Sequence, residues 1–480
     1  MILLTLDKNQ TPEVCLEHRL AIWRQSAHTG SADVFAMRFT HVATYLPGKP
    51  RQDLLALVAI LPSQQAIPGP EVWVSIFPTS GERLAAIEGL AADCESFEFY
   101  CRQQGIPRVA LASPLLLEPV FIPKPWGQEV WYTGVEARGQ AGVRGVGGNL
   151  PLPWVLEFMY SKLSLAAGAP LILLKVLDPL ADTPYGDLYF ELHQQKQEVY
   201  VVTHVDQSAW PDGRGAIQLG FNPKVREQFK TPEEFKQAYL SAVSRYERTR
   251  RIIDDLLDEK KQECGIALDQ PVSVDQLKLW IKQLSQKAEY QELMLREQLL
   301  KKAMDAFIDQ HRLGVGDVVA IPRLVPHALQ HGVRVVEFQT PVYERKILSF
   351  GQKVLTQAHW DTEAALQLVD MDAAPFTPPV PLYQSDQIQV QQIVNFDEFE
   401  VQRIVLRGTC QLPVAGYALL MVLEGEVTIS GHTLLATGDV ALLTATVLPQ
   451  TYSSTGALLL WAIPRSDTCL ASGLTHPAST

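Results

Sequence analysis

Residues 189–205 read YFELHQQKQEVYVVTHV, and this stretch decides the fold. Glu191 and His193 are separated by one position, so on a strand both side chains point to the same face. Glu198 stands directly before the apolar run 199–202, which indicates that a second strand begins there after a four-residue turn. A hairpin of the two strands would bring Glu198 beside His193, so we expect these carboxylates and imidazole in one place.

Residues 316–328, GDVVAIPRLVPHA, supply the second half of the pattern. Gly316 and Asp317 are typical of a tight corner, the four apolar residues after them are typical of a buried strand, and Pro322 follows that strand. A further turn then returns His327. We therefore expect His327 to join the group formed by the first stretch.

Two imidazoles and two carboxylates suit a borderline divalent ion, because imidazole nitrogen binds such ions and the carboxylates neutralise their charge. The predicted metal ligands are Glu191, His193, Glu198 and His327. Zn²⁺ is the expected ion, with Fe²⁺ or Mn²⁺ as alternatives. The plainer interpretation is that the histidines are structural and the glutamates solvated. His204 and His331 have no partner at ligand spacing, so we expect them at the surface or behind the ligands.

The composition is that of a globular protein with several domains. The 480 residues exceed one ordinary core, so two to four domains are expected. Hydrophobic residues make up 47% and charged residues 20%, which argues against a disordered chain. The 53 acidic and 41 basic side chains give a formal charge of -12. Nucleic acid and anionic membranes are therefore not expected as partners, and an anionic substrate would need a local basic pocket.

Cysteine usage and hydropathy point to the cytoplasm. The six cysteines are scattered and form no CxxC pair, so neither a zinc ribbon nor a dense disulfide framework is expected. The first residues lack the basic flank and long apolar run of a signal peptide, and no apolar stretch reaches the roughly 18 residues of a membrane span. We expect a cytoplasmic protein without membrane insertion; the sequence sets no oligomeric state.

Strand and helix patterns divide the chain. Residues 1–115 mix the two patterns and carry no chemical motif. The tract 119–153 is rich in proline and glycine and is expected to be mostly loop and turn. A charged, helix-favouring segment at about 231–312 lies between strand-like stretches, with Thr231 as candidate N-cap and Pro232 after it. We interpret this segment as a helical insertion.

The two ligand stretches resemble the paired motifs of the cupin superfamily. In those motifs His-x-His is followed by a glutamate five positions later, and then by glycine, five residues, proline and a later histidine. Glu191 stands here in place of the first histidine, and Leu324 stands where glycine is usual. The resemblance implies a mainly β (α+β) protein with bicupin β-barrels, a helical insertion and an additional N-terminal α/β region.

Within that superfamily the chain resembles type I mannose-6-phosphate isomerases. Residues 173–178, LLKVLD, resemble the buried strand before that family's Gln-x-His ligand pair, with Glu191 in place of the glutamine. The family's Lys-x-Glu and following aromatic are matched by Lys196, Glu198 and Tyr200. This match implies Glu198 as a ligand and Lys196 as a cation that faces substrate. The loop before Glu198 is shorter than is usual in the family.

The second stretch is similar to the same family. Its glycine, aspartate, apolar strand, proline and His-Ala are matched by residues 316–328, and its downstream Glu-x-Gln by Glu337 and Gln339. Arg345 resembles the family's active-site arginine. The resemblance implies Glu337 as an acid/base group, and Lys196 and Arg345 as cations for oxyanion or phosphate charge. For Arg345 the alternative is a solvated position in a mixed charged cluster.

The carboxy-terminal residues resemble a second cupin module. The similarity lies in residues 423–426 and 438–439, and residues 448–450 supply no ligand histidine, so this module is expected to be metal-free. The resemblance covers about residues 120–465. The expected domains are an α/β region of unknown role at 1–115, a metal-binding cupin domain with the helical insertion at 116–375, and a metal-free cupin domain at 376–480.

The resemblance implies a metal-dependent aldose–ketose isomerase acting on a hexose phosphate, mannose 6-phosphate to fructose 6-phosphate in that family. Such a reaction moves a proton between adjacent carbons through an enediolate, so the site must supply a base and stabilise an oxyanion. A non-catalytic or regulatory sugar-binding bicupin with a structural metal is the alternative, and an oxygenase-type cupin is a third. Trp126, Glu129 and Trp131 would rim a sugar site, or the tryptophans would anchor an irregular segment, which we favour.

Overall fold

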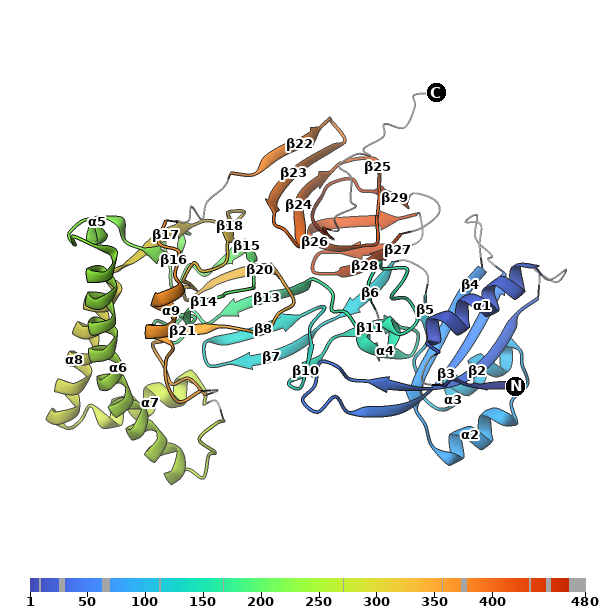
Figure 1. Cartoon of the computed structure of the whole chain (residues 1–480), viewed down its shortest axis with the longest axis horizontal. Coiled ribbons are helices and arrows are strands. Elements are labelled where there is room, and N and C mark those ends of the chain that lie inside the picture. Colours follow the sequence, from blue (N-terminus) through green and yellow to red (C-terminus); the bar gives the residue numbers. More distant parts are fainter. Residues whose placement is uncertain are drawn as a thin grey trace. The chain divides into compact units, whose positions relative to one another are not determined.

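The computed structural model describes residues 1–7, 10–25, 31–62, 70–111, 114–166, 168–270, 272–355, 357–372, 378–430, 433–445 and 450–465. The chain forms two compact units, both built largely of strands (Figure 1). Unit 1 comprises Met1–Val120, Trp131–Leu173 and Pro379–Thr480, and unit 2 comprises Phe121–Val130 and Leu174–Pro378. The division into three domains stays a prediction.

Unit 1 begins with the expected α/β region. Its five-stranded sheet has the order β1-β2-β3-β4-β5, with β1 parallel to β2 and the other pairs antiparallel. Helices α2 and α3 bury Ile87, Phe97 and Tyr100 in a core shared with the sheet. The elements are β1 Ile2–Thr5, α1 Pro12–Gln25, β2 Asp33–Val42, β3 Arg51–Pro62, β4 Pro70–Pro78, α2 Gly81–Glu88, α3 Cys94–Gln103 and β5 Val109–Ala110.

The rest of unit 1 is mainly a sheet of twelve strands around one apolar core. The first elements are β6 Leu115–Glu118, β9 Val135–Glu136, β10 Gly139–Gln140, β11 Gly142–Gly145, β12 Gly148–Pro151 and α4 Leu152–Leu156. The carboxy-terminal strands are β22 Val380–Gln384, β23 Ile388–Asn395, β24 Phe399–Leu406, β25 Thr409–Leu412, β26 Tyr417–Ile429, β27 Thr433–Ala436, β28 Val440–Thr444, β29 Gln450–Ser453 and β30 Ala457–Pro464.

The prediction that residues 119–153 are mostly loop and turn was wrong. They form six short strands, β7 to β12, because the glycines lie at the ends of strands or in the turns between them and not in strand interiors. Gly147 and Gly148, for example, have φ values of +86° and +136° where β11 turns into β12. Proline and glycine thus shorten these strands without abolishing them.

Unit 2 contains two sheets. The six-stranded sheet has the order β18-β15-β20-β13-β8-β7, and the five-stranded sheet has the order β17-β16-β19-β14-β21. The strands are β7 Val120–Lys124, β8 Gly127–Trp131, β13 Leu173–Pro179, β14 Phe190–Leu192, β15 Glu198–Val205, β16 Gly215–Phe221, β17 Ile308–Leu313, β18 Val318–Ile321, β19 His327–Leu329, β20 Val333–Gln339 and β21 Lys346–Ser349.

The helical insertion begins as expected and ends earlier. Thr231 caps the first helix by accepting a hydrogen bond from the Glu234 amide at 3.1 Å. The predicted end near residue 312 was wrong, because Ile308–Leu313 pairs with β16 as strand β17. The helices of unit 2 are α5 Pro223–Arg226, α6 Pro232–Glu263, α7 Val274–Leu284, α8 Ala288–Asp305 and α9 Thr362–Leu368.

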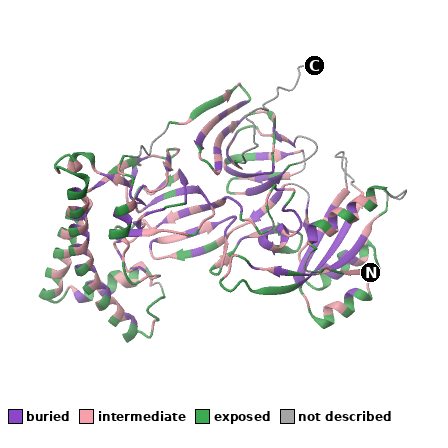
Figure 2. Ribbon diagram, viewed as in Figure 1, coloured by how far each residue is buried: buried purple, intermediate pink, exposed green. Residues whose placement is uncertain are grey.

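Two apolar cores lie on the two faces of the five-stranded sheet. One contains Tyr189, Ile217 and Leu329 together with Tyr200 and Val335 of the six-stranded sheet, so the two sheets face each other. The other joins the opposite face to α6, α8 and α9. Figure 2 shows these strands largely buried and the outer sides of α6 and α8 exposed. A strand such as β14 therefore sends alternate side chains toward the sheets' common interior and toward the helices.

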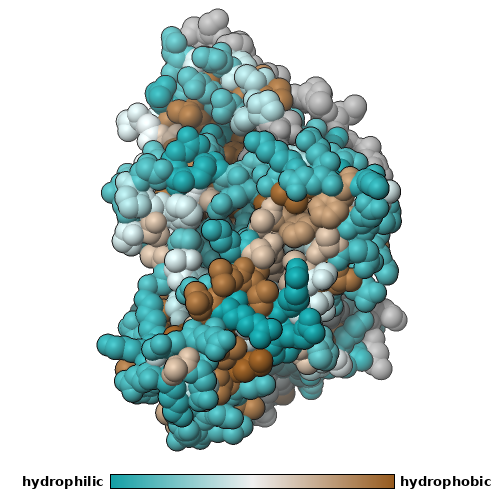
Figure 3. Space-filling model, turned by 90° about the vertical axis from the view of Figure 1, so that its left-hand side faces the viewer, coloured by the Kyte–Doolittle hydropathy of each residue, from teal (hydrophilic) through white to brown (hydrophobic). Residues whose placement is uncertain are grey.

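The side of the molecule that bears α6 and α8 faces the viewer in Figure 3 and is mainly hydrophilic, with separate hydrophobic areas. Leu295 and Leu299 of α8 are among the exposed apolar side chains. In the described part of the chain, no helix combines the length and apolar character that a membrane span requires.

Gly127 should be indispensable to the start of β8. Its φ is +144°, and an added Cβ would lie 2.3 Å from the carbonyl oxygen of Asp178. We expect Gly127→Ala to lower the free energy of unfolding by at least about 2 kcal/mol, through backbone strain and steric overlap. Gly213→Ala is the control, because Gly213 has a φ of +70° and nothing within 4 Å of an added Cβ. Equal urea-unfolding midpoints for the two variants would contradict this account.

Candidate metal centre

Three side chains from the two sheets of unit 2 converge in the interior. His193 follows β14, Glu198 begins β15 and His327 begins β19. One ligand atom of each lies within 4.8 Å of the other two. His193 Nε2 is 3.4 Å from Glu198 Oε1, and His327 Nε2 is 3.1 Å from Glu198 Oε2. Each side chain is almost fully buried.

The route by which Glu198 reaches His193 differs from the expected hairpin. That prediction was wrong, because β14 pairs on both edges with β19 and β21, whereas β15 pairs with β18 and β20. The four-residue turn therefore crosses from one sheet to the other, and the two side chains meet across the interior. The carboxylate of Glu344 holds this turn by accepting hydrogen bonds from the amides of Gln195 and Lys196 at 2.9 and 3.3 Å.

Backbone carbonyls orient both imidazoles. His193 Nδ1 lies 2.9 Å from the carbonyl oxygen of Glu344, and His327 Nδ1 lies 3.1 Å from that of Val325. A carbonyl only accepts, so Nδ1 carries the proton, and in the neutral ring Nε2 presents a lone pair. Burial, with the nearby Lys196 ammonium, lowers the pKa of His193 well below its usual value, which keeps the ring neutral. Neutral imidazoles held in this way are metal ligands in many proteins.

The donor set fits a divalent ion. When both rings are neutral, their Nε2 lone pairs face carboxylate oxygens of Glu198, and a cation among these acceptors removes their mutual repulsion. His193 Nε2 is buried and has no hydrogen-bond partner among the described residues. Ligand atoms around tetrahedral zinc are roughly 3.3 Å apart, given Zn–N distances of about 2.0–2.1 Å. Two separations, 3.4 Å from His193 Nε2 to Glu198 Oε1 and 3.1 Å from His327 Nε2 to Glu198 Oε2, are close to this spacing.

Glu191 lies at the edge of this group. Its Cα pairs with that of His327 across β14 and β19, which places the side chain on the interior face. Its Oε1 is 3.8 Å from His193 Nε2, and its Oε2 is 3.7 Å from Nη1 of Arg345. A modest side-chain movement would make it the fourth ligand. The four-residue ligand set stays a prediction.

Leu324 connects the two ligand stretches. Its amide donates to the carbonyl oxygen of His193 at 2.7 Å, and its φ is +66°, in the left-handed region that favours glycine. Leucine therefore keeps the backbone conformation for which cupins usually have glycine, at a cost of about 1–2 kcal/mol. Gly316 has a φ of +89°, as a tight corner requires.

The implied catalytic residues lie around the same interior. Across β15 and β20, Glu337 is opposite Tyr200 and Gln339 is opposite Glu198, so their side chains share the face of Glu198. Lys196 Nζ is 3.1 Å from Glu198 Oε1. Burial opposes ionisation of Glu198, yet Lys196 holds the pKa of this carboxyl well below its usual range. The Tyr200 hydroxyl donates to Glu198 Oε2 at 2.9 Å.

Glu337 is only 1% exposed, and burial raises the pKa of its carboxyl well above the usual value. Lys175 Nζ lies 3.2 Å from its Oε2. Burial alone would lower the pKa of Lys175, but Glu129 and Glu337 raise it above its ordinary value. Lys124 Nζ lies 3.1 Å from Glu129, so basic and acidic side chains alternate along a largely buried series of Lys124, Glu129, Lys175 and Glu337.

Lys175 and Lys124 were missed from the sequence. A signal for Lys175 was present, because a lysine inside the apolar run LLKVLD is rarely buried without an acidic partner. The partners come from β8 and β20, which the sequence does not place beside β13. The interior thus holds more positive charge than was expected.

Arg345 is largely shielded from solvent rather than solvated. Its side chain is 18% exposed, and its guanidinium carbon lies 4.6 Å from the centre of the Tyr189 ring. Together with the contact to Glu191, this places a cation beside the ligand group. Tyr343, nearby in sequence, is 74% exposed.

The remaining candidates lie elsewhere. His204 is exposed on β15, and His331 Nδ1 lies 2.7 Å from Asp187. Trp126 is buried in the core between the two sheets of unit 2, as expected of an anchor. Residues 448 and 449, part of the stretch expected to supply no ligand in the second module, lie outside the described residues.

Comparison of the structure with solved proteins identifies the fold. Mannose 6-phosphate isomerase from Bacillus subtilis aligns with a TM-score of 0.50 and 14% identity over 73% of this chain and 99% of its own. A mutant of phosphomannose isomerase from Salmonella typhimurium aligns with a TM-score of 0.47 and 14% identity over 74% of this chain and all of its own. No protein-family model matches the chain, and no curated protein matches its sequence. The predicted β-rich, cupin-like fold is confirmed.

Proposed function

We propose that this protein is a metal-dependent aldose–ketose isomerase that acts on a hexose phosphate, with mannose 6-phosphate and fructose 6-phosphate as the expected pair. One observation carries the proposal. The buried carboxyl of Glu337 faces the same interior as the His193, Glu198 and His327 group, and Lys175 lies beside it. An acid/base group, a ligand set and cations are what an enediolate reaction requires.

The ligand group would hold a divalent ion, with Zn²⁺ expected. Such an ion supplies a Lewis acid that polarises a sugar oxygen. His193 and His327 offer neutral nitrogens, Glu198 offers a carboxylate, and Glu191 is the proposed fourth ligand. Lys196 Nζ lies 3.1 Å from one oxygen of the Glu198 carboxylate, and the Tyr200 hydroxyl donates to the other at 2.9 Å.

Glu337 would act as the general base and acid that transfers the proton. Burial raises the pKa of this carboxyl, so its ionised form is a stronger base toward a carbon acid. It would take the proton from the carbon next to the carbonyl and deliver it to the former carbonyl carbon, while the proton of the adjacent hydroxyl passes to the former carbonyl oxygen, so that atoms and electrons balance. Lys175, 3.2 Å away, keeps the ionised form accessible.

Lys196 and Arg345 would supply the local positive charge that a phosphorylated substrate needs. A protein of formal charge -12 needs a local basic pocket for a phosphorylated sugar. Lys196 lies next to Glu198, and Arg345 lies next to Glu191. We propose that they receive oxyanion or phosphate charge, and that the partner is a small sugar phosphate in the cytoplasm.

A coupled assay on the purified full-length protein tests this proposal, with bound metal measured on the same sample. We expect interconversion of mannose 6-phosphate and fructose 6-phosphate, loss of activity after chelation, and recovery with Zn²⁺. Absence of turnover with any hexose phosphate, in protein that carries stoichiometric metal, would reject the isomerase. The sugar-binding protein with a structural metal would then be favoured, and calorimetric binding of the same sugar phosphates would test it.

A further inference from the structure

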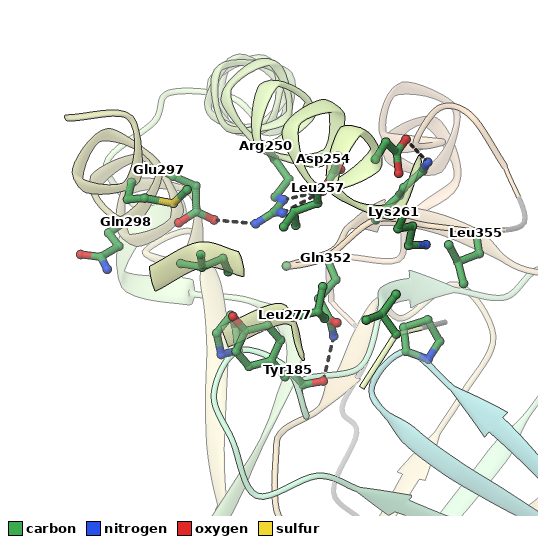
Figure 4. A pocket seen from close by; sticks show the side chains of 18 of the residues that line it. Tyr185, Arg250, Asp254, Leu257, Lys261, Leu277, Glu297, Gln298, Gln352 and Leu355 are labelled. Atoms are coloured by element: carbon green, nitrogen blue, oxygen red, sulfur yellow. Dashed lines mark hydrogen bonds and ion pairs between the residues drawn. The ribbon is translucent and has the colours of Figure 1, made fainter. Parts of the chain in front are cut away.

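A cavity lies in unit 2 beneath the helical insertion. Its volume is about 320 Å³, near the lower end of the roughly 300–1,000 Å³ range of ligand pockets. Figure 4 shows α6 above it with Arg250 and Asp254 directed inward, and Tyr185 and Gln352 on the opposite side. Helices α7 and α8 supply Leu277 and Glu297 among the other lining residues, so the insertion builds most of the walls.

This cavity is separate from the candidate metal centre. Strands β14 and β21 are antiparallel, with Leu192 opposite Lys346 and Phe190 opposite Ser349. The metal centre lies at the end of this strand pair where β14 finishes and β21 begins, because His193 directly follows β14 and Arg345 directly precedes β21. The cavity uses the other end, before β14 and after β21, through Tyr185 and Gln352. None of the predicted metal ligands lines it.

The polar part of the lining offers a donor and an acceptor side by side. Arg250 is buried and binds Asp254 through Nε and Nη2 at 2.9 and 2.8 Å. Its Nη1 is 3.9 Å from Glu297 Oε1, which is too long for a hydrogen bond. The Tyr246 hydroxyl fixes Glu297 by donating at 2.9 Å. The Arg250 guanidinium and the Glu297 carboxylate are thus held in place, and each can form a further hydrogen bond with an occupant of the cavity.

The charges of the lining balance. The cations Arg250, Lys261 and Lys353 stand against the anions Asp254, Asp258 and Glu297. Lys353 forms an ion pair with Asp258, and the Lys261 ammonium donates to the carbonyl oxygens of Leu268 and Gln270 at 3.0 and 2.8 Å. A phosphate dianion would face three carboxylates without a spare cation, so the cavity does not suit a sugar phosphate.

The remaining walls are apolar. They come from α6, α7, α8 and the segment after β21, and they include Leu257, Leu277, Ile281, Met294 and Leu355. Side chains of this kind gain free energy by covering a ring or a branched alkyl group of comparable size. An occupant therefore needs an apolar body as well as a polar edge.

We propose that this cavity binds an uncharged small molecule with a ring-sized apolar body and an amide-like edge. The edge would accept a hydrogen bond from Arg250 and donate one to Glu297, and the body would lie against the leucines, isoleucine and methionine of the walls. The site belongs to the helical insertion and is independent of the sugar-phosphate chemistry proposed for the metal centre.

Benzamide is the probe for this proposal, with benzoate as its anionic counterpart of the same shape. Binding to the full-length, metal-loaded protein is measured by saturation-transfer NMR and by titration calorimetry. We expect millimolar or tighter binding of benzamide and at least about tenfold weaker binding of benzoate, since the carboxylate would meet Glu297.

Two variants of α7 locate the binding. Leu277→Trp should fill the cavity and weaken benzamide binding at least about tenfold. Leu279→Trp is the matched control, because Leu279 is 48% exposed on the same helix and does not line the cavity. Circular dichroism and bound metal should be unchanged in both. Equal benzamide affinity in the Leu277→Trp and unmodified proteins, no detectable benzamide binding, or preference for benzoate would each overturn the proposal.

Discussion

Replacing both His193 and His327 with alanine will strip the protein of its bound metal. The substitution leaves Glu198 and Glu191 without nitrogen ligands, and two carboxylates alone hold a borderline ion far more weakly. Bound metal should fall from about one ion per chain to less than about a tenth, as measured by mass spectrometry after gel filtration. A metal that binds only the folded chain also stabilises it, by about 4 kcal/mol at a thousand times its Kd. The melting temperature of the variant should therefore no longer respond to added Zn²⁺.

His204→Ala is the matched control for this experiment. His204 lies on the same strand as Glu198, but its side chain is exposed. The control should keep the full metal content and the stabilisation by Zn²⁺. Unchanged metal content in the double variant would show that the ion, if present, is held elsewhere, and the ligand set would then be wrong.

Glu337→Gln should abolish most turnover while leaving the metal in place. Glutamine has the shape of glutamate but cannot take a proton from carbon, and loss of a general base reduces kcat by roughly 10²–10⁴. The exchange of the substrate's C2 hydrogen with deuterium from solvent should fall in parallel, because that exchange requires the same proton transfer. KM and metal content should change little.

Glu129→Gln serves as the control for Glu337→Gln. Both carboxyl groups lie close to Lys175 Nζ, at 3.9 Å for Glu129 and 3.2 Å for Glu337. Each variant therefore removes one acidic group from the surroundings of the same lysine. If only the charge around Lys175 matters, the two variants will lose activity equally. If Glu337 carries the proton, Glu129→Gln will retain kcat within about tenfold. Full deuterium exchange in the Glu337→Gln variant would reject the assignment.

The sequence alone determined the parts of the site that depend on local periodicity. One position between Glu191 and His193 fixes a common face on a strand, and Glu198 does begin the next strand. Gly316 takes the positive φ of a corner, and His327 returns to the group after the following turn. These outcomes follow from backbone geometry over a few residues, which a sequence records directly.

The tertiary structure decided the features that depend on which strands become neighbours. The hairpin between residues 193 and 198 was a reasonable local prediction, but β19 and β21 occupy both edges of β14, so the turn crosses between sheets. Likewise the Lys175–Glu337 contact joins residues 162 positions apart only because β13 and β20 are adjacent. Pairing of distant strands and burial of charge are long-range effects, so the chain's ligand spacing could be predicted, whereas its interior charge network and the cavity beneath its helical insertion could not.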